Sequence, residues 1–312
     1  MKTIIIKEPG KFEIAEAPKP VPAENDILIE MKYMALCNQH DWKVNKGLYK
    51  DLAYLEYGIP GFPGHEGAGI VVEKGAAVKN WSVGDRVALS GLGGPPLYAE
   101  YVTRQSDAVA RVDSSVPLEN VAMAELLGCV YRACTKYPDY RDKSVLVSGA
   151  GPGGLAAVQI CKALGAAEVT ATDVRPNRLE LARVLGANSV LDVSDPDAVN
   201  RLKRDGVDVV VECSGNKTAY RNAIDIARDA IVIFAYSEGS LEIPLWPLFD
   251  HELTIYNSKW LTTADLQSVI DLIAAGKIRT DDMISGRVKF EGYTEAVKLV
   301  GEGDAIKIVM MP

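Results

Sequence analysis

A glycine-rich segment, VLVSGAGPGGLAAVQICKALG at residues 145–165, places the strongest constraint on the fold of this chain. Gly149, Gly151 and Gly154 have GxGxxG spacing, with an apolar strand before them and a helix opening at the third glycine. Asp173 ends the next strand, 19 residues beyond Gly154. Such glycines permit a tight turn, a close approach to a pyrophosphate and close helix–strand packing, while the helix N-terminus offers free N–H groups to the anion. The segment therefore predicts a dinucleotide-binding α/β fold.

The residues around this loop also bear on which dinucleotide is bound. A carboxylate at Asp173 can accept hydrogen bonds from the adenosine ribose hydroxyls and would repel a 2′-phosphate, which favours NAD over NADP. Arg178 lies five residues further on and is expected to reach the ribose or the adenine edge, unless it is a solvated helix charge. We expect Gly153 to belong to the same cofactor site.

The chain changes character along its length of 312 residues, which is enough for two domains with separate cores. The first hundred residues contain short β-rich runs separated by glycine and proline clusters. From about residue 120, short apolar strands alternate with amphipathic helices, a pattern typical of a parallel sheet with helices on both faces. The sequence thus predicts an α/β fold, with a doubly wound parallel sheet preceded by a β-rich domain.

Charge and composition exclude several classes of protein. The net charge of −8, without a basic run, argues against a nucleic-acid binder. No apolar stretch approaches the roughly 18 residues of a membrane span, and the apolar run at the N-terminus is too short for a signal-peptide core. The five cysteines are scattered and odd in number, unlike a secreted disulfide framework. We therefore expect a cytoplasmic protein.

A second group of residues has the chemistry of a metal site. The motif GHEGAG contains His65 and Glu66, Cys37 follows an upstream strand, and Glu125 and Cys129 lie where the α/β region begins. A cysteine, a histidine and a third cysteine or carboxylate, with one position left open, form a catalytic zinc site. Taken by itself, the glycine-flanked histidine is equally compatible with a turn that enters a strand.

Together these motifs resemble the zinc-dependent medium-chain dehydrogenase/reductase family, which includes the alcohol and polyol dehydrogenases. The resemblance covers essentially the whole chain and rests on Cys37, Gly64–Glu66, VGDRVA at 83–88, YAEYV at 98–102, the glycine-rich loop, ECSG at 212–215 and AIKIV at 305–309. It implies a Rossmann coenzyme domain over residues 126–258. It also implies a β-rich, GroES-like catalytic domain over residues 1–125 and 259–312, with the active site in the cleft between the two.

The resemblance assigns roles to the candidate ligands. In the family the histidine of GHE binds zinc, and the adjacent glutamate binds the metal directly or lies just beyond the direct ligands, so Cys37, His65 and Glu66 are expected at the metal. Lys307 matches a basic residue that meets the cofactor pyrophosphate; the alternative is a surface lysine.

The third ligand is contested between two residues on one predicted helix. Glu125 lies 24 residues before Gly149 and Cys129 lies 20 before it. The family places its third ligand about two dozen residues before this glycine, which favours Glu125. A glutamate here resembles the polyol, sugar and threonine dehydrogenases, whereas a cysteine ligand would indicate a simple alcohol dehydrogenase.

Two features depart from the family pattern. The stretch ALSGLGGPPLYAEYV lacks the cysteines that hold a second, structural zinc, so we expect one zinc per chain. The family's proton-relay Ser or Thr is replaced by Gln39, which cannot relay a proton as a hydroxyl does. His40 could do so, because its pKa lies near neutrality, or it could be a polar residue on the cleft wall. Asp41 is expected to support the zinc-bound histidine, and Trp42, Tyr49 and Tyr54 are expected to line the substrate pocket or to pack.

The resemblance predicts an NAD-dependent enzyme that oxidises a secondary hydroxyl of a polyol, sugar or related small metabolite, and reduces the corresponding ketone. The alternatives are a simple alcohol or amino-alcohol dehydrogenase of the threonine type, a zinc-free quinone or enone reductase, and a non-enzymatic NAD-binding sensor. We expect a homodimer or homotetramer that binds neither nucleic acid nor a membrane.

Overall fold

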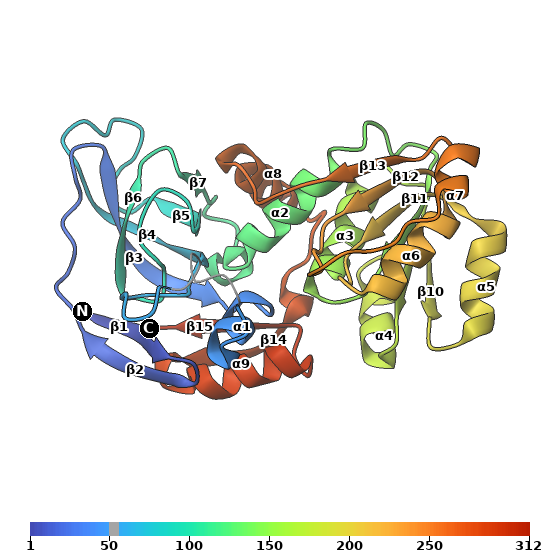
Figure 1. Cartoon of the computed structure of the whole chain (residues 1–312). Helices are drawn as coiled ribbons and strands as arrows, with labels where there is room; N and C mark the ends of the chain where they lie inside the picture. Colours follow the sequence, from blue (N-terminus) through green and yellow to red (C-terminus); the bar gives the residue numbers. More distant parts are fainter. Residues whose placement is uncertain (50–55) are drawn as a thin grey trace. The chain divides into compact units, whose positions relative to one another are not determined.

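The structure, a computed structural model, describes residues 1–49 and 56–312 of the chain. This part of the chain forms two compact units (Figure 1). Unit 1 comprises Met1–Leu126, Thr262–Ala274 and Met283–Pro312, and unit 2 comprises Leu127–Leu261 and Ala275–Asp282.

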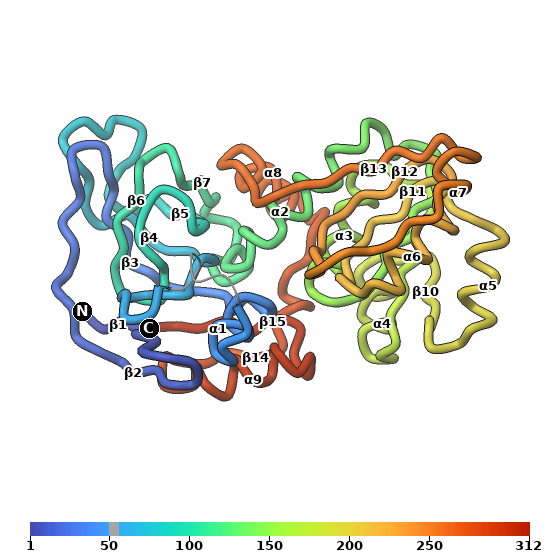
Figure 2. Tube along the Cα trace, in the orientation of Figure 1, coloured from blue at the N-terminus to red at the C-terminus, as the bar shows by residue number. Residues whose placement is uncertain are grey.

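Unit 1 is built on a seven-stranded, mainly antiparallel sheet and a separate β hairpin. Strand β3 (Asp26–Ala35) pairs with β4 (Glu66–Lys74), β6 (Tyr101–Gln105) and β15 (Lys307–Met311). The C-terminal strand β15 thus lies beside strands from the first part of the chain (Figure 2). The other strands of unit 1 are β5 (Arg86–Ser90), β7 (Val109–Arg111) and β14 (Ile284–Lys289) in the sheet, and β1 (Lys2–Glu8) and β2 (Lys11–Glu16) in the hairpin.

Short helices complete unit 1. Helix α1 (His40–Lys46) ends at Gly47, whose left-handed backbone, with φ of 63°, suits a glycine. Helix α9 (Tyr293–Glu302) packs against α1, and Trp42 of α1 lies so close to Gly301 that a side chain there would collide with the indole. The remaining elements are α8 (Thr263–Ala274), α2 (Ala124–Cys134), which continues into unit 2, and the 3-10 turns η2 (Leu118–Val121), η3 (Asp281–Met283) and η4 (Phe290–Gly292).

Unit 2 contains a six-stranded parallel sheet of order β10-β9-β8-β11-β12-β13, flanked by helices (Figure 1). The chain runs from β8 to β10 in one direction across the sheet and from β11 to β13 in the other, so the order reverses between β8 and β11. In open α/β sheets ligands bind at the carboxyl ends of the strands beside such a reversal. The strands are β8 (Ser144–Ser148), β9 (Glu168–Asp173), β10 (Ser189–Asp192), β11 (Val207–Glu212), β12 (Ala227–Ile233) and β13 (Thr254–Asn257).

The helices of unit 2 begin at residues suited to helix N-termini. Proline occupies the first turn of three of them, where its missing N–H has no helical partner to lose. Asn216 caps α6 by accepting a hydrogen bond from Thr218 N at 2.8 Å. The helices are α3 (Pro152–Ala163), α4 (Pro176–Val184), α5 (Pro196–Asp205), α6 (Lys217–Ile226) and α7 (Leu245–Asp250).

The predicted fold class is confirmed: a Rossmann-type parallel sheet and a β-rich unit are both present. None of the helices in residues 1–49 and 56–312 is long and apolar enough to span a membrane.

Candidate metal centre and dinucleotide site

Three of the predicted ligands come together at one end of the sheet of unit 1. Cys37 follows strand β3, and His65 and Glu66 stand at the start of β4. Because Met34 of β3 pairs with Gly67 of β4, these strand ends lie side by side. The Cys37 sulfur, an imidazole nitrogen of His65 and a carboxylate oxygen of Glu66 all lie within 4.8 Å of one another.

The donor atoms in this group fit a bound zinc ion. Glu66 is 1% exposed; its Oε1 accepts a hydrogen bond from Lys307 Nζ at 2.6 Å, but its buried Oε2 has no hydrogen-bond partner among the described residues. His65 Nδ1 lies 2.9 Å from Pro63 O, and when this nitrogen carries the ring proton, Nε2 offers a lone pair. Thiolate, imidazole and carboxylate are the usual protein ligands of Zn²⁺.

The electrostatics also favour a cation. Burial acts to lower the pKa of His65, but Cys37 and the carboxylates of Glu125 and Glu66 raise this pKa well above its ordinary value. Burial raises the pKa of Glu66 to about 7, with Lys307 acting against it and Glu125 adding to it. Several anionic donors thus crowd a buried space, where a divalent cation would relieve their repulsion.

The two candidates for the third protein ligand share helix α2. Glu125 stands in its first turn, close enough for its charge to act on both His65 and Glu66, although it lies outside the group of three. Cys129 is half-buried one turn further along the helix. The assignment of Glu125 as a ligand remains a prediction.

Asp41 supports the Cys37 turn and not His65, which differs from the expectation. Its fully buried carboxylate accepts hydrogen bonds from Cys37 N, Tyr98 Oη and Tyr293 Oη, each at 2.9 Å. The imidazole of His65 is held instead by the carbonyl of Pro63. Sequence reasoning missed the two tyrosines, because neither lies near Asp41 in the chain.

The predicted relay residues differ in their surroundings. His40 Nδ1 lies 2.6 Å from the Tyr49 hydroxyl, and its ring centroid is 5.2 Å from that of His65. Burial, together with the nearby charges of His65 and Lys43, lowers the pKa of His40 to about 3, so its imidazole is neutral at pH 7. Gln39 is exposed at the start of α1.

The aromatic residues predicted to line a substrate pocket make different contacts. Trp42 packs against Gly301 of α9, in line with the packing alternative. Tyr49 contacts the ring of His40. Tyr54 lies outside the described residues.

Lys307 is 1% exposed, so the alternative of a surface lysine is wrong. Its contact with a cofactor pyrophosphate stays a prediction. Its Nζ donates to Leu36 O at 2.7 Å and to Glu66 Oε1 at 2.6 Å. In this structure the residue is the partner of a metal-site carboxylate.

In unit 2 the predicted dinucleotide residues gather between β8 and α3. Gly149 has φ of 89°, a conformation that favours glycine, and Gly154 lies against the carbonyl of Gly149 with no room for a side chain. Gly151 caps α3, and Gly153 stands in its first turn. This geometry matches what the motif requires of its glycines.

The predicted specificity residues flank the same loop. Asp173 Oδ2 accepts from Ala150 N at 2.8 Å, and Oδ1 accepts from Val174 N and Arg175 N. Arg178 Nη1 lies 3.8 Å from Asp173 Oδ2. The carboxylate therefore orders the loop itself, and its contact with a ribose remains a prediction.

Glu212 is a further residue of this site to which the sequence analysis gave no role. It ends β11, is fully buried, and accepts hydrogen bonds from Ser214 N at 3.0 Å and Gly215 N at 3.1 Å. Ser214 in turn packs against Gly149, so this turn supports the glycine-rich loop. The signal was present in VDVVVECSG, where an acid follows three consecutive valines at the end of a strand.

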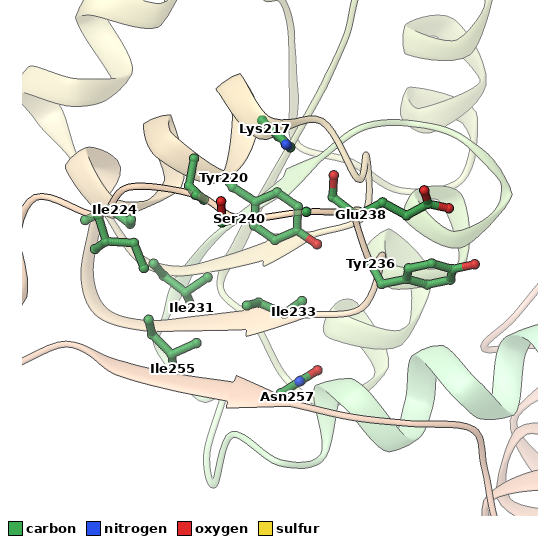
Figure 3. Close-up of a pocket in the computed structure, with 14 residues that line it drawn as sticks. Lys217, Tyr220, Ile224, Ile231, Ile233, Tyr236, Glu238, Ser240, Ile255 and Asn257 are labelled. Atoms are coloured by element: carbon green, nitrogen blue, oxygen red, sulfur yellow. The ribbon is translucent and has the colours of Figure 1, made fainter. Parts of the chain in front are cut away.

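Unit 2 also contains a pocket with a volume of about 360 Å³ (Figure 3). Helix α6, the strands β12 and β13 and the segment 236–243 provide its walls. Ile224, Ile231 and Ile255 gather at one end, and Tyr236 and Asn257 lie at the other. No cysteine contributes to this pocket, and it has a single acidic side chain, so it does not offer a zinc site.

Comparisons with known proteins agree with this architecture. Residues 23–170 match the alcohol dehydrogenase GroES-like domain, and residues 152–275 match the zinc-binding dehydrogenase domain. The chain is 26% identical to a probable D-xylulose reductase A of Aspergillus clavatus, over 96% of this chain and 94% of that protein. It is also 26% identical to a sorbitol dehydrogenase of Halalkalibacterium halodurans, over 97% and 96%.

A solved structure gives the same result for the fold. The crystal structure of 2R,3R-butanediol dehydrogenase from Bacillus subtilis superimposes with a TM-score of 0.89 at 23% identity, covering 100% of this chain and 99% of that one. The two domain matches together span most of the sequence, and the predicted resemblance is confirmed. The chain belongs to the zinc-binding medium-chain dehydrogenases, a family of NAD(P)-dependent alcohol and polyol dehydrogenases.

Proposed function

We propose that the protein is an NAD-dependent dehydrogenase that interconverts a secondary hydroxyl and a ketone in a polyol, sugar or related small metabolite. The observation that carries the proposal is the group of Cys37, His65 and the buried Glu66, in which one carboxylate oxygen has no hydrogen-bond partner in the described part of the chain. The names of the relatives, a xylulose reductase and a sorbitol dehydrogenase, support the substrate class.

In this proposal Cys37, His65, Glu66 and Glu125 hold one zinc ion per chain. When bound, zinc supplies a Lewis acid that polarises the substrate oxygen. Lys307 holds Oε1 of Glu66 and thereby leaves Oε2 directed to the metal. Asp41 fixes the Cys37 main chain, and Pro63 fixes the tautomer of His65.

The proposal assigns movement of the hydroxyl proton to His40 and Tyr49. Because the pKa of His40 is about 3, and not near neutrality as the sequence suggested, the ring does not hold a second proton at pH 7. In the proposed transfer one ring nitrogen takes the hydroxyl proton while Nδ1–H gives its proton to Tyr49 Oη, 2.6 Å away, and Tyr49 releases its own proton to water, so the ring stays neutral throughout. Gln39 stands at the relay position of the family, but an amide does not transfer protons in this way.

The nicotinamide cofactor is proposed to bind at the reversal of the unit 2 sheet. The pyrophosphate would lie over the N-terminus of α3, with Gly149, Gly151, Gly153 and Gly154 beneath it. Asp173 is proposed to select NAD over NADP, with Arg178 beside it.

The test combines metal analysis with turnover. Purified protein should contain about one zinc per chain. It should reduce NAD with at least one member of a panel of polyols, sugar alcohols and amino alcohols. Activity restricted to amino alcohols would move the assignment to the threonine type. A folded protein that retains no zinc and reduces quinones would contradict the proposal.

We also propose a homo-oligomer, a dimer or tetramer, assembled through the outer edge of unit 2. Strand β13 lies at the edge of the sheet, and Leu245, Trp246 and Phe249 of α7 are 76%, 68% and 75% exposed. An open sheet edge beside exposed aromatic side chains is typical of a self-association surface. Light scattering should give the wild type the molar mass of a dimer or a larger assembly. Trp246→Glu should reduce that mass to the mass of the monomer. A monomeric wild type would contradict the proposed oligomer.

A further inference from the structure

Arg104 is the largest fully buried side chain among the described residues, and its surroundings are unusual for a charged group. Nε and Nη2 donate to Ser90 O at 3.4 Å and 3.2 Å, and Nη1 donates to Thr103 O at 2.8 Å. Burial lowers the pKa of Arg104 to about 10, and no carboxylate in the described part of the chain counteracts this. The group therefore stays protonated at pH 7 with main-chain carbonyls as its partners.

Burying a charge without a counter-ion costs free energy, and here hydrogen bonds to main-chain carbonyls offset part of that cost. A buried arginine of this kind indicates that its hydrogen bonds hold a particular part of the main chain in place. Here they fix one end of a short segment, residues 91–97, that follows β5. The segment rests on the guanidinium: a Cβ atom added to Gly94 would lie 2.5 Å from Arg104 Nη1. The neighbouring Gly93 O accepts a hydrogen bond from Gln105 N at 2.9 Å.

The other side of the same segment touches the candidate metal centre. Ser90 pairs with Glu66 across β4 and β5, and a Cβ atom on Gly91 would lie 3.1 Å from His65 Cβ. Leu97 N donates to Gly64 O at 2.8 Å, directly before His65. Residues 90–97 thus lie between Arg104 and two of the proposed ligands.

We propose that Arg104 is a positioning residue of the metal centre: it holds residues 90–97 against His65 and Glu66 and so presets the geometry in which these two side chains receive the metal. This inference rests on the proposed function, because it requires that His65 and Glu66 bind a metal ion. It adds a residue from β6 that does not itself approach the ligands.

The test compares Arg104→Met with a matched control, Arg86→Met. Arg86 lies on the adjoining part of the sheet and also donates to main-chain carbonyls, those of Asp113 at 2.9 Å and Val116 at 2.6 Å, but it does not contact residues 91–97. Two properties are measured: amide hydrogen exchange at Leu97 and Tyr98 in metal-free protein, and Co²⁺ binding followed by its visible absorption bands.

In Arg104→Met we expect faster exchange at these two amides, a changed Co²⁺ spectrum and a dissociation constant for Co²⁺ about 10-fold higher. Arg86→Met should leave the exchange rates, the spectrum and the dissociation constant unchanged. For Arg104→Lys each of these properties should lie between that of Arg104→Met and that of the wild type. A Cβ atom at Gly94 would lie 2.4 Å from Thr103 O as well as 2.5 Å from Arg104 Nη1, so Gly94→Ala pushes the segment away from both the β6 main chain and the guanidinium while the charge remains. It should reproduce the altered spectrum and provides the test if Arg104→Met does not fold.

The outcomes separate the two proposals. If wild-type protein binds Co²⁺ but folded Arg104→Met and Gly94→Ala bind it equally tightly with the same spectrum, the positioning role is wrong while the metal centre stands. If the wild type takes up neither Co²⁺ nor Zn²⁺, the proposed metal centre is wrong, and the role of Arg104 is overturned with it.

Discussion

At the scale of single residues, the chemistry of each candidate ligand depends on what holds its other atoms. Glu66 has one oxygen bound to Lys307 and one without a partner in residues 1–49 and 56–312, and His65 has one nitrogen held by Pro63. Each side chain thus offers one atom and has the other restrained. Restraint of this kind orients ligands and reduces the conformational freedom lost when a metal binds.

The first prediction concerns the third protein ligand. Glu125→Ala should strongly weaken zinc retention and turnover, because it removes a carboxylate whose charge acts on His65 and Glu66. Cys129→Ala should retain zinc and lower the free energy of unfolding by about 1 kcal/mol, as for loss of a small buried group. Metal content measured by mass spectrometry distinguishes them. Zinc lost from the cysteine variant and kept in the glutamate variant would reverse the assignment.

The second prediction concerns the cofactor. Asp173→Ser should reduce the preference for NAD over NADP, because it removes the charge that would repel a 2′-phosphate. The measurement is kcat/KM for both cofactors with one substrate. Arg183→Ser, a change in the last turn of helix α4, which follows the strand that Asp173 ends, serves as the control and should not alter the ratio. A wild type that prefers NADP would show that Asp173 has another role.

At the scale of elements, the proposed metal centre depends on contacts between segments that are remote in sequence. Asp41 of α1 accepts a hydrogen bond from Tyr293 of α9, 252 residues further along the chain, and also from Tyr98. These bonds fix the Asp41 side chain at the start of α1. The Asp41 carboxylate in turn accepts a hydrogen bond from the main-chain nitrogen of Cys37 and so holds that residue. Helix α9 is therefore part of the support of a ligand that it does not touch.

The third prediction follows from this contact. Tyr293→Phe should lower the free energy of unfolding by about 2 kcal/mol, because a hydrogen bond to a buried charged group is lost. It should also weaken zinc binding through Cys37. Tyr57→Phe removes a hydroxyl that donates to the carbonyl of Val44, and it should leave zinc binding unchanged. Equal zinc affinity in wild type and Tyr293→Phe would show that α9 does not support the centre.

The fourth prediction concerns acid stability in unit 2. Asp208 accepts hydrogen bonds from Ser144 N and Oγ, which link β11 to β8. Burial acts to raise the pKa of Asp208, but the bonds from Ser144 outweigh it and hold this pKa below the ordinary value of 3.8. Since the folded-state pKa is depressed, the carboxylate stabilises the fold above pH 3.8, and this contribution is lost as the pH falls through the folded-state pKa.

Asp208→Asn should therefore lower the unfolding temperature at pH 6. Between pH 5 and pH 3 the unfolding temperature of this variant should fall less than that of the wild type. Asp197→Asn, at an exposed carboxylate in the first turn of α5, is the control and should follow the wild-type curve. If the plots of unfolding temperature against pH run parallel for Asp208→Asn and the wild type, Asp208 is not the group whose protonation destabilises the fold in acid.

At the scale of the whole molecule, the sequence predicted the fold class because its signals are local. The glycine-rich loop and the alternation of strands and helices each lie within a short window, and both predict the parallel sheet that unit 2 contains. What the sequence could not predict are long-range partners. Rules of composition place lysine and arginine at the surface, so neither the pairing of Lys307 with Glu66 nor the burial of Arg104 is visible in the chain.

The fifth prediction uses the division into two units. The four proposed ligands belong to unit 1, whereas the glycine-rich loop and Asp173 belong to unit 2. Removing zinc with a chelator should lower the calorimetric transition of unit 1 by mass action and leave NAD binding to unit 2 unchanged. Readdition of zinc should restore the transition. NAD binding that is lost together with zinc would show that the units do not respond separately.

The Lys307–Glu66 contact has a consequence for the kind of ion that the centre can accept. With Cys37 ionised, the two glutamates and the thiolate bring three negative charges and Lys307 brings one positive charge to the same buried region. A divalent ion makes this region electrically neutral. A monovalent or trivalent ion would leave a net charge away from water, where a charge is costly. If the proposed ligands bind a metal ion, we expect Lys307 to set the valence that the site prefers, although it contributes no ligand atom.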